Sequence, residues 1–261
     1  YSIKKKSVLL RVDFNVPLGE DGNVADNQRV IAAIPTIKKI IQSNCRYLLI
    51  ASHLGRPDGI RCEKFSLRPV ANALEQVLQV PVTFLDDCVG PKVMHACANA
   101  KNGQIFMLEN LRFHPEEERK QKNAVTKEKI ICPEQAILDF RHALSSLADI
   151  AINDAFGTLH RAHSSIVGLS IPVVAGYLVK RELAYLSQVL SDPKHPIDLA
   201  ILGGAKVFDK IQLIENLLLH VKRLIIAGGM AYTFLHVLNG TSIGNSLYDE
   251  KGANSVRKII K

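Results

Sequence analysis

The sequence predicts an α/β protein built on parallel sheets, and three observations support this prediction. Six short apolar runs, starting near residues 8, 47, 105, 149, 199 and 223, alternate with segments of helical periodicity. The runs are continuously apolar, which is typical of strands buried on both faces of a parallel sheet. A loop of polar residues or glycine follows each run, where ligands bind in such sheets. We therefore expect three-layer αβα domains.

The segments between the apolar runs predict helices. Apolar residues three and four apart predict a first helix over 28–43, which Asp26 or Asn27 could cap. Pro35 inside this stretch predicts a kink or a late start. The same spacing predicts further helices over 66–78, 133–147, 180–190, 209–219, 230–238 and 250–260.

The loops divide the chain into two parts. Up to about residue 170 they are rich in Arg and His, and after about residue 190 they are rich in Gly. We expect an N-terminal domain over 1–172, a linker and interdomain helix over 173–190, and the first part of a second domain over 191–261. Only two strands are expected after residue 190, too few for an independently stable sheet. Either the second domain is incomplete or the division into two domains is wrong.

Composition narrows the class of partner. A net charge of +8 is compatible with nucleic-acid binding. However, the basic residues are spread along the chain and aromatic residues make up only 6%, so the stacking platforms of a single-strand binder are missing. The mixed-sign segment 116–122 is interpreted as a solvated surface. We expect no nucleic-acid partner.

Cysteine usage and hydropathy bear on location. The five cysteines are widely spaced, form no C-x-x-C pair and predict no metal site. We interpret them as free thiols of a reducing, cytoplasmic compartment. The first residues are not followed by an apolar segment, so no signal peptide is expected. No apolar stretch reaches the roughly 20 residues of a membrane span, so no membrane contact is expected.

Four loops that follow apolar runs each carry an arginine. These are Arg11, Arg56, Arg112 and Arg161, and histidines His53 and His160 stand near two of them. Each loop alone could be structural, with a salt bridge or a turn as its only role. Several uncompensated arginines in one crevice would repel one another unless an anion offset the cost. Together, the loops favour a site for a small polyanion, with Asp13 and Asn15 able to accept hydrogen bonds from its hydroxyls.

Two later loops have the composition of phosphate sites. Gly203–Lys210 lies between an apolar run and a helical segment, and Gly228 and Gly229 lie in a similar position. Small residues let the backbone approach a phosphate, and Lys206 and Lys210, four residues apart, would share a face. A tight turn that needs glycine for geometry alone is the alternative. Neither a G-x-x-x-x-G-K-[ST] nor a G-x-G-x-x-G motif occurs.

Five motifs, in this order, closely resemble the phosphoglycerate kinase family. They are RVDFNVP (11–17), SHLGRPDG (52–59), LENLRFHPEEE (108–118), NDAFGT with HRAHSS (153–165) and ILGGAKV (201–207). The resemblance covers nearly the whole chain. Departures are small: Leu159 and Phe208 stand where the family usually has a small residue, and Ala227 replaces a glycine.

The resemblance implies a two-domain hinge enzyme of glycolysis and gluconeogenesis. Such a transferase moves a phosphoryl group reversibly between 1,3-bisphosphoglycerate with ADP and 3-phosphoglycerate with ATP. It implies that the glycerate contacts Asp13 and Asn15, and that Arg29 and Lys206 are catalytic. It places further acid-binding residues at His53, Arg56, Arg112, His160 and Arg161, and nucleotide-binding residues at Gly204, Ala205, Lys206, Lys210, Gly228 and Gly229.

The resemblance also implies what lies outside this chain. Mg²⁺ would enter with ATP or ADP, and the aspartate that binds it is expected beyond residue 261. We expect a monomer, and we expect the 261-residue chain to be inactive alone. Two other functions were weighed: a phosphoglycerate-binding module without catalysis, and a sugar-phosphate isomerase or aldolase barrel. The barrel is disfavoured because no series of eight evenly spaced strands is present.

Overall fold

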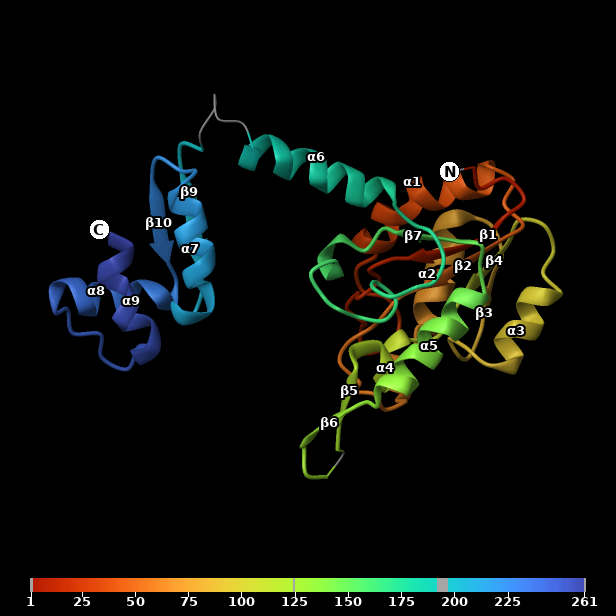
Figure 1. Ribbon diagram of the computed structural model, residues 1–261, viewed down its shortest axis with the longest axis horizontal. Helices are drawn as coiled ribbons and strands as arrows, with labels where there is room; N and C mark the ends of the chain where they lie inside the picture. The colour runs from red at the N-terminus through yellow and green to blue at the C-terminus, as the bar shows by residue number, and fades with distance from the viewer. Residues whose placement is uncertain (1, 124, 192–196, 261) are drawn as a thin grey trace. The chain divides into compact units, whose positions relative to one another are not determined.

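Figure 1 shows the computed structural model of the chain, which describes residues 2–123, 125–191 and 197–260. The chain divides into two compact units, Tyr1–Glu182 (unit 1) and Leu183–Lys261 (unit 2). The boundary falls inside helix α6 (Tyr177–Ser191). The domain limits expected at residues 172 and 190 stay predictions, and residues 192–196 at the expected start of the second domain lie outside the described residues.

Unit 1 is built on a parallel sheet of six strands in the order β3-β4-β2-β1-β7-β8. The strands expected from the apolar runs are confirmed as β1 (Ser7–Arg11), β2 (Tyr47–Ala51), β4 (Gln104–Met107) and β7 (Ile150–Asn153). The two edge strands, β3 (Val82–Phe84) and β8 (Val173–Ala175), were not predicted. Each has only three residues and is partly exposed, so it lacks the apolar run of a central strand.

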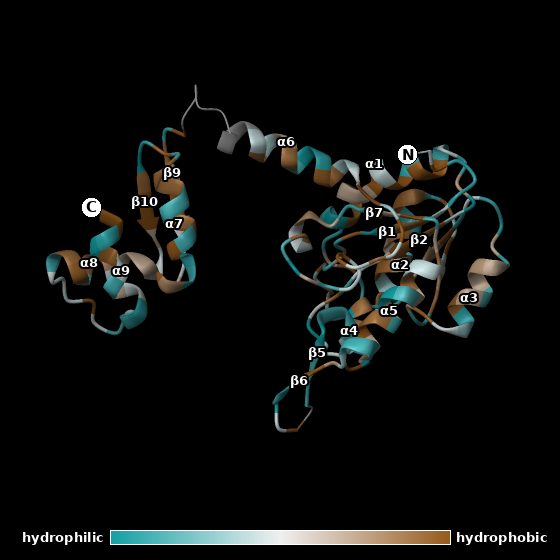
Figure 2. Cartoon of the chain, in the orientation of Figure 1, coloured by the Kyte–Doolittle hydropathy of each residue, from teal (hydrophilic) through white to brown (hydrophobic). Residues whose placement is uncertain are grey.

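Helices cover both faces of this sheet. α1 (Gln28–Gln42) and α2 (Arg68–Leu78) pack on one face, and α3 (Pro91–Ala98) and α5 (Glu134–Ser146) pack on the other. Successive strand residues point to opposite faces, so Leu10 joins the first core and Leu9 the second. The interiors of its central strands are apolar, as the brown segments of the sheet in Figure 2 show. The expected αβα layering is confirmed for this unit.

Two helix starts have identifiable causes. α1 begins at Gln28, as the apolar spacing predicted, and continues through Pro35, so of the two effects predicted for Pro35 the late start is wrong. Its start is stabilised by Asp26, whose Oδ1 accepts from the Gln28 amide at 2.8 Å, and its apolar face is buried on the sheet. α6 begins at Tyr177, three residues before the expected start, because buried Asp154 accepts hydrogen bonds from the amides of Leu178 and Val179.

The remaining elements of unit 1 are short. α4 (Pro115–Glu118) leads into an antiparallel hairpin of β5 (Lys120–Lys122) and β6 (Lys129–Ile131), which projects from the unit in Figure 1. The three 3₁₀ turns are Glu63–Phe65, Leu111–Phe113 and Phe156–Thr158. The expectation of a solvated segment over 116–122 is right for exposed Arg119, Lys120 and Lys122 and wrong for Glu117, which is fully buried. A hairpin was not predicted.

Unit 2 has a parallel pair of strands, β9 (Ala200–Gly203) and β10 (Leu224–Ala227). A 3₁₀ turn (Phe208–Lys210) precedes α7 (Ile211–Leu218), and α8 (Gly229–Asn239) and α9 (Glu250–Ile260) follow β10. The core is a small cluster of Val207, Ile214, Met230, Phe234 and Val256. In the described part of the chain, no helix is long and apolar enough to cross a membrane.

Candidate functional site

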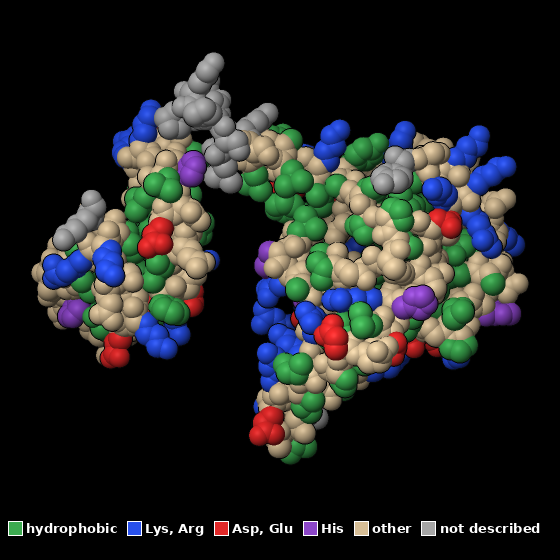
Figure 3. Space-filling view, viewed as in Figure 1, with side chains coloured by type: hydrophobic (Ala, Val, Ile, Leu, Met, Phe, Trp, Pro, Cys, Tyr) green, Lys and Arg blue, Asp and Glu red, His purple; other side chains and the backbone are tan. Residues whose placement is uncertain are grey.

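A cavity of about 510 Å³ lies beyond the carboxyl ends of β1, β2, β4 and β7 in unit 1, and we call it the cationic cavity. Its wall carries six Lys or Arg side chains against three carboxylates. The lining residues are Asp13, Asn15, Arg29, His53, Gly55, Arg56, Asp58, Arg112, Glu118, Lys120, Lys122, Gly157, Thr158 and Arg161. Figure 3 shows Lys and Arg gathered along the side of unit 1 next to the hairpin. The wall is therefore suited to an anion.

Most of the acid-binding residues expected from the sequence converge on this cavity. Their loops follow four strands that are neighbours in the sheet, so their ends meet at one edge. His160 is the exception, because its side chain is exposed and it does not line the cavity. The expected residues that do line it are Asp13, Asn15, Arg29, His53, Arg56, Arg112 and Arg161.

Close contacts hold the loops of the cavity in place. The side chain of Asn15 accepts a hydrogen bond from the Gly55 amide at 2.8 Å, which joins the loop after β1 to the loop after β2. A Cβ atom on Gly157 would lie 2.8 Å from a carboxylate oxygen of Asp13, so glycine is needed where the loop after β7 approaches. These contacts fix the loops after β1, β2 and β7 relative to one another.

The four arginines expected to be uncompensated fall into three groups. Arg112 pairs with Glu118 at 3.4 Å and donates to the carbonyl of Gly55 at 2.8 Å. Arg11 is buried and does not line the cavity. Among the described residues, the side chains of Arg56 and Arg161 have neither an ion pair nor a hydrogen bond. The expectation of arginines without acidic partners is therefore right for two positions and wrong for Arg112.

Arg29 has a partner of its own. It lies in the first turn of α1 and its Nη1 is 2.8 Å from Oδ1 of Asp13, while half of its side chain remains exposed. Lys122 similarly pairs with Asp58 at 3.2 Å. The excess positive charge of the cavity is carried by Arg56, Arg161 and Lys120.

Two histidines at the cavity are held neutral. Burial lowers the pKa of His53 far below its ordinary value, and the neighbouring charges of Arg11 and Arg112 act in the same direction. Burial, followed by Arg112 and Arg11, lowers the pKa of His163 to about 3. His163 lies behind the cavity wall, with its ring nitrogens 3.7 and 3.5 Å from the carboxylates of Glu117 and Glu118.

Several lining residues were not predicted from the sequence. Lys120 and Lys122 come from the hairpin, whose mixed charges resemble an ordinary solvated surface. Thr158 and Glu118 lie inside motifs that were singled out for their arginines. Their contribution depends on the tertiary fold, and no local signal in the sequence could have found it.

In unit 2 the two glycine-containing loops lie against each other. The amide of Met230 donates to the carbonyl of Gly204 at 2.9 Å. Gly228 has a φ of +67°, and a Cβ there would lie 3.1 Å from that same carbonyl oxygen. A Cβ on Gly229 would lie 3.3 Å from Ala205. The expected nucleotide-binding residues Gly204, Ala205, Gly228 and Gly229 are therefore brought together.

The two lysines of this region lie differently from expectation. Lys206 is exposed and precedes the helical turn, because Val207 is buried in the core and the 3₁₀ turn begins only at Phe208. The amide of Phe208 donates to the carboxylate of Asp249 at 2.8 Å, which fixes the start of the turn. Lys210 ends the turn, and its Cε lies 3.9 Å from where a Cβ added to Gly204 would be.

Within the described residues, the one group of three close potential metal ligands is Asp87, Cys88 and His114. The Cys88 thiol donates to the carbonyl of Glu109 at 2.9 Å, and burial raises its pKa well above the ordinary value. His114 already contacts Asp87 at 2.7 Å. Cys88 and His114 thus each have a hydrogen-bond partner within the fold, and we assign this group a structural role.

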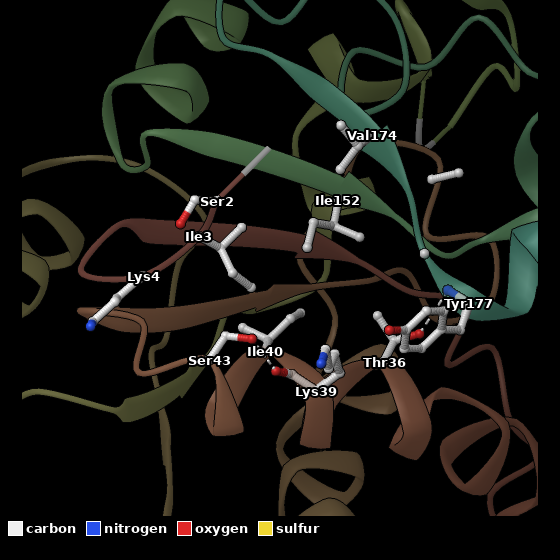
Figure 4. Close-up of a pocket in the computed structure, with 12 residues that line it drawn as sticks. Ser2, Ile3, Lys4, Thr36, Lys39, Ile40, Ser43, Ile152, Val174 and Tyr177 are labelled. Carbon is white, nitrogen blue, oxygen red and sulfur yellow. Dashed lines mark hydrogen bonds between the residues drawn. The ribbon is translucent and has the colours of Figure 1, made fainter.

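A second pocket of unit 1, of about 340 Å³, lies away from the motifs. Figure 4 shows the apolar side chains of Ile3, Ile40, Ile152 and Val174 around it. The hydroxyl of Thr36 accepts a hydrogen bond from the Tyr177 amide at 3.0 Å at one end. The pocket gathers no group of charges comparable to that of the cationic cavity, so the latter is the candidate site.

The sequence matches the phosphoglycerate kinase family over residues 1–261. It is 55% identical over 258 residues to phosphoglycerate kinase of Schizosaccharomyces pombe, covering 99% of this chain and 61% of that protein. It is 53% identical over 261 residues to phosphoglycerate kinase of Saccharomyces cerevisiae, covering 99% and 62%. The chain thus spans about 61% of the length of the curated relatives it matches.

Solved structures show the same relationship. The fold matches phosphoglycerate kinase from Coxiella burnetii with a TM-score of 0.78 and 33% identity, over 100% of this chain and 61% of the other. It matches phosphoglycerate kinase from Pyrococcus horikoshii with a TM-score of 0.77 and 29% identity, over 94% and 57%. The fold and the cavity define an α/β protein with a cationic cavity at one edge of its sheet. The chain belongs to the phosphoglycerate kinase family.

Proposed function

We propose that this chain provides the acid-binding part and the first nucleotide-binding loops of a phosphoglycerate kinase. The reaction is reversible phosphoryl transfer between 1,3-bisphosphoglycerate with ADP and 3-phosphoglycerate with ATP, as the names of its relatives indicate. Unit 1 binds the acid in the cationic cavity. Unit 2 binds nucleotide phosphates, with Mg²⁺ as part of the nucleotide substrate.

The charge of the cationic cavity is the observation that carries this proposal. Six cationic side chains face three carboxylates, and His53 is neutral, so three positive charges remain without a partner in the wall. A phosphate monoester carries close to two negative charges near pH 7, and a carboxylate adds a third. A small triply charged acid therefore balances the cavity.

The groups in the cavity match the two ends of such an acid. Arg56 and Arg161 are free for bidentate contacts with phosphate or carboxylate oxygens. Asp13 and Asn15 lie at the same wall and accept hydrogen bonds from hydroxyls. Arg29 remains half exposed beside Asp13, where it would stabilise charge on the transferring phosphoryl group. His160, outside the cavity, would act only at its periphery.

The loops of unit 2 match the phosphate groups of a nucleotide. Gly204 and Ala205 expose backbone that a phosphate can approach, and Gly228 and Gly229 lie against them. Lys206 and Lys210 supply positive charge. Phosphoryl transfer depends on in-line positioning and charge stabilisation, so we propose that closure of the two units brings both ligands together during turnover.

A chimaera tests the proposal. This chain replaces the matching 61% of the Schizosaccharomyces pombe enzyme, which it resembles at 55% identity, and ATP formation from 1,3-bisphosphoglycerate and ADP is measured. We expect turnover, and we expect Arg29→Ala to lower kcat by roughly two orders of magnitude, as for other charge-stabilising donors. A chimaera that folds and binds 3-phosphoglycerate but transfers no phosphoryl group would instead indicate a binding module. Monomeric state and cytoplasmic location stay predictions.

A further inference from the structure

Arg11 is a buried cation that approaches the cationic cavity without lining it. It is the last residue of β1 and only 3% exposed. Its Nε donates to Oγ of Ser165 at 3.0 Å, and its Nη1 donates to the carbonyl of Val12. Its Nη2 lies 3.2 Å from Nδ1 of His53, which does line the cavity. Arg11 therefore reaches the cavity only through this histidine.

The direction of each hydrogen bond around Arg11 is determined by chemistry. Glu117 is wholly buried, and its two carboxylate oxygens accept from Oγ of Ser165 at 2.6 Å and from the Ser165 amide at 2.9 Å. Ser165 has a single hydroxyl proton, which it donates to Glu117, so its oxygen accepts from Arg11. A guanidinium group has donors only, so Nδ1 of His53 accepts. A neutral imidazole whose Nδ1 accepts carries its proton on Nε2.

We propose that Arg11 is a positioning residue that fixes His53 as the neutral Nε2–H tautomer, so that His53 offers a hydrogen-bond donor to the anion in the cavity. Ser165 orients Arg11 by accepting a hydrogen bond from its Nε, and the buried carboxylate of Glu117 balances the positive charge of Arg11. This inference rests on the proposed function, since it assigns a role in binding the same anion. It adds Arg11 as a residue that acts on the ligand through another side chain.

The surroundings of His53 favour a neutral donor over an imidazolium. Burial, followed by the charges of Arg11, Arg112, His163 and Arg29, lowers the pKa of His53 and so disfavours the charged form of the ring. An imidazolium would place one more cation against a buried arginine. A fixed Nε2–H instead donates to an anion without any charge change of its own across the neutral pH range.

Nuclear magnetic resonance tests the tautomer without any ligand. Long-range ¹H–¹⁵N correlations are recorded on the ¹⁵N-labelled 261-residue chain, and the signals of His53 are identified by their loss in His53→Gln. We expect Nε2 to resonate as a protonated nitrogen and Nδ1 as an unprotonated one, unchanged from about pH 8 to about pH 5, where an unperturbed histidine gains a proton. A protonated Nδ1, or a titration in that range, overturns the proposal.

Variants then test whether Arg11 is the cause. Arg11→Met combined with Glu117→Gln removes the buried cation together with its balancing anion, which limits the cost to folding. We expect the signals of both tautomers to appear and the affinity for 3-phosphoglycerate to fall about tenfold, as for loss of one hydrogen bond to a charged group. Arg11→Lys keeps a donor and is expected to restore the single tautomer. A wild-type tautomer in the double variant would refute a role for Arg11.

Two controls separate this inference from the proposed function. The exposed His142→Gln variant should leave both the His53 signals and the affinity unchanged. If His53 shows the expected tautomer and calorimetry detects no binding of 3-phosphoglycerate, the proposed function fails, while the assigned directions of the hydrogen bonds around Arg11 stand. If the acid binds and Nδ1 of His53 carries the proton, the proposed function stands and the assignment of Arg11 fails.

Discussion

The two units of this chain present candidate anion sites of different kinds. Unit 1 places charged side chains at one edge of a six-stranded sheet whose two faces are both covered by helices. Among its described residues, unit 2 has two strands and one small core, and it presents backbone from two adjoining loops with lysines beside them. A site made of side chains needs a rigid frame, because each arginine must be aimed. A site made of backbone needs small residues and loops that lie close together.

The two sheets also differ in how far their apolar side chains are buried. In unit 1 the central strands β1 and β2 are buried along their whole length. In unit 2, Ile201 of β9 is 68% exposed and Ile225 of β10 is 47% exposed. Apolar side chains at the same structural position thus contribute much more to stability in unit 1 than in unit 2. The predictions below test this contrast, starting with the largest effect.

The first prediction concerns the catalytic contribution of unit 2. In the chimaera, Lys206→Ala should lower kcat by roughly two orders of magnitude. The reason is that this exposed lysine, beside the two glycine-containing loops of unit 2, is proposed to supply positive charge to the transferring phosphoryl group. Lys222→Ala is the matched control, since that exposed lysine pairs with Asp198 outside the loops. Steady-state kinetics measures both. Near-normal turnover in Lys206→Ala would remove this lysine from the mechanism.

A second prediction compares the two cores directly. Leu48→Ala in β2 should lower the free energy of unfolding of unit 1 by about 2–5 kcal/mol, because the side chain is fully buried. Ile201→Ala in β9 should change stability by less than about 0.5 kcal/mol, as for most surface substitutions. Urea unfolding followed by circular dichroism gives both values. Equal effects would contradict the contrast in burial.

The third prediction concerns pH and is smaller. The pKa of His163 is about 3 in the folded chain and near 6.5 when unfolded, so the unfolded state binds more protons between these values. Stability should therefore fall as pH drops from about 6.5, by at most about 1.4 kcal/mol per pH unit for this group. His163→Gln should make the loss shallower, and exposed His142→Gln should not. Unfolding measured at several pH values decides between them.

Features of the fold and site that depend on residues close together in the sequence could be predicted from the sequence alone, and features that depend on distant residues could not. The central strands, α1, α2 and α5 follow from apolar spacing, and the convergence of Arg56 with Arg161 follows from parallel strands ending at one edge. The pairing of Arg112 with Glu118 could not be predicted, because it depends on how the chain turns between these two residues. The buried position of Arg11 could not be predicted either, because its contact with Ser165 joins segments far apart in the sequence. The hairpin lysines entered the cavity for the same reason.

The exclusion of His160 shows a further limit. It stands next to Arg161 in the same motif, yet the turn after β7 directs Arg161 into the cavity and leaves His160 exposed. Adjacent residues in a tight turn point in different directions, and sequence spacing does not say which one faces the ligand. Likewise, the place of Lys206 before the turn was set by burial of Val207.

The central claim is that partnerless cations in unit 1 bind a triply charged acid, and calorimetry of 3-phosphoglycerate with the 261-residue chain tests it most directly. We expect saturable binding to one site that weakens with added salt, and a loss of affinity of about tenfold or more in Arg56→Ala with Arg161→Ala, since each removes a charged hydrogen-bond donor. Arg46→Ala, before β2 at the other end of the strand, should bind as the parent does. Absence of saturable binding, or unchanged affinity in the double variant, would contradict the account.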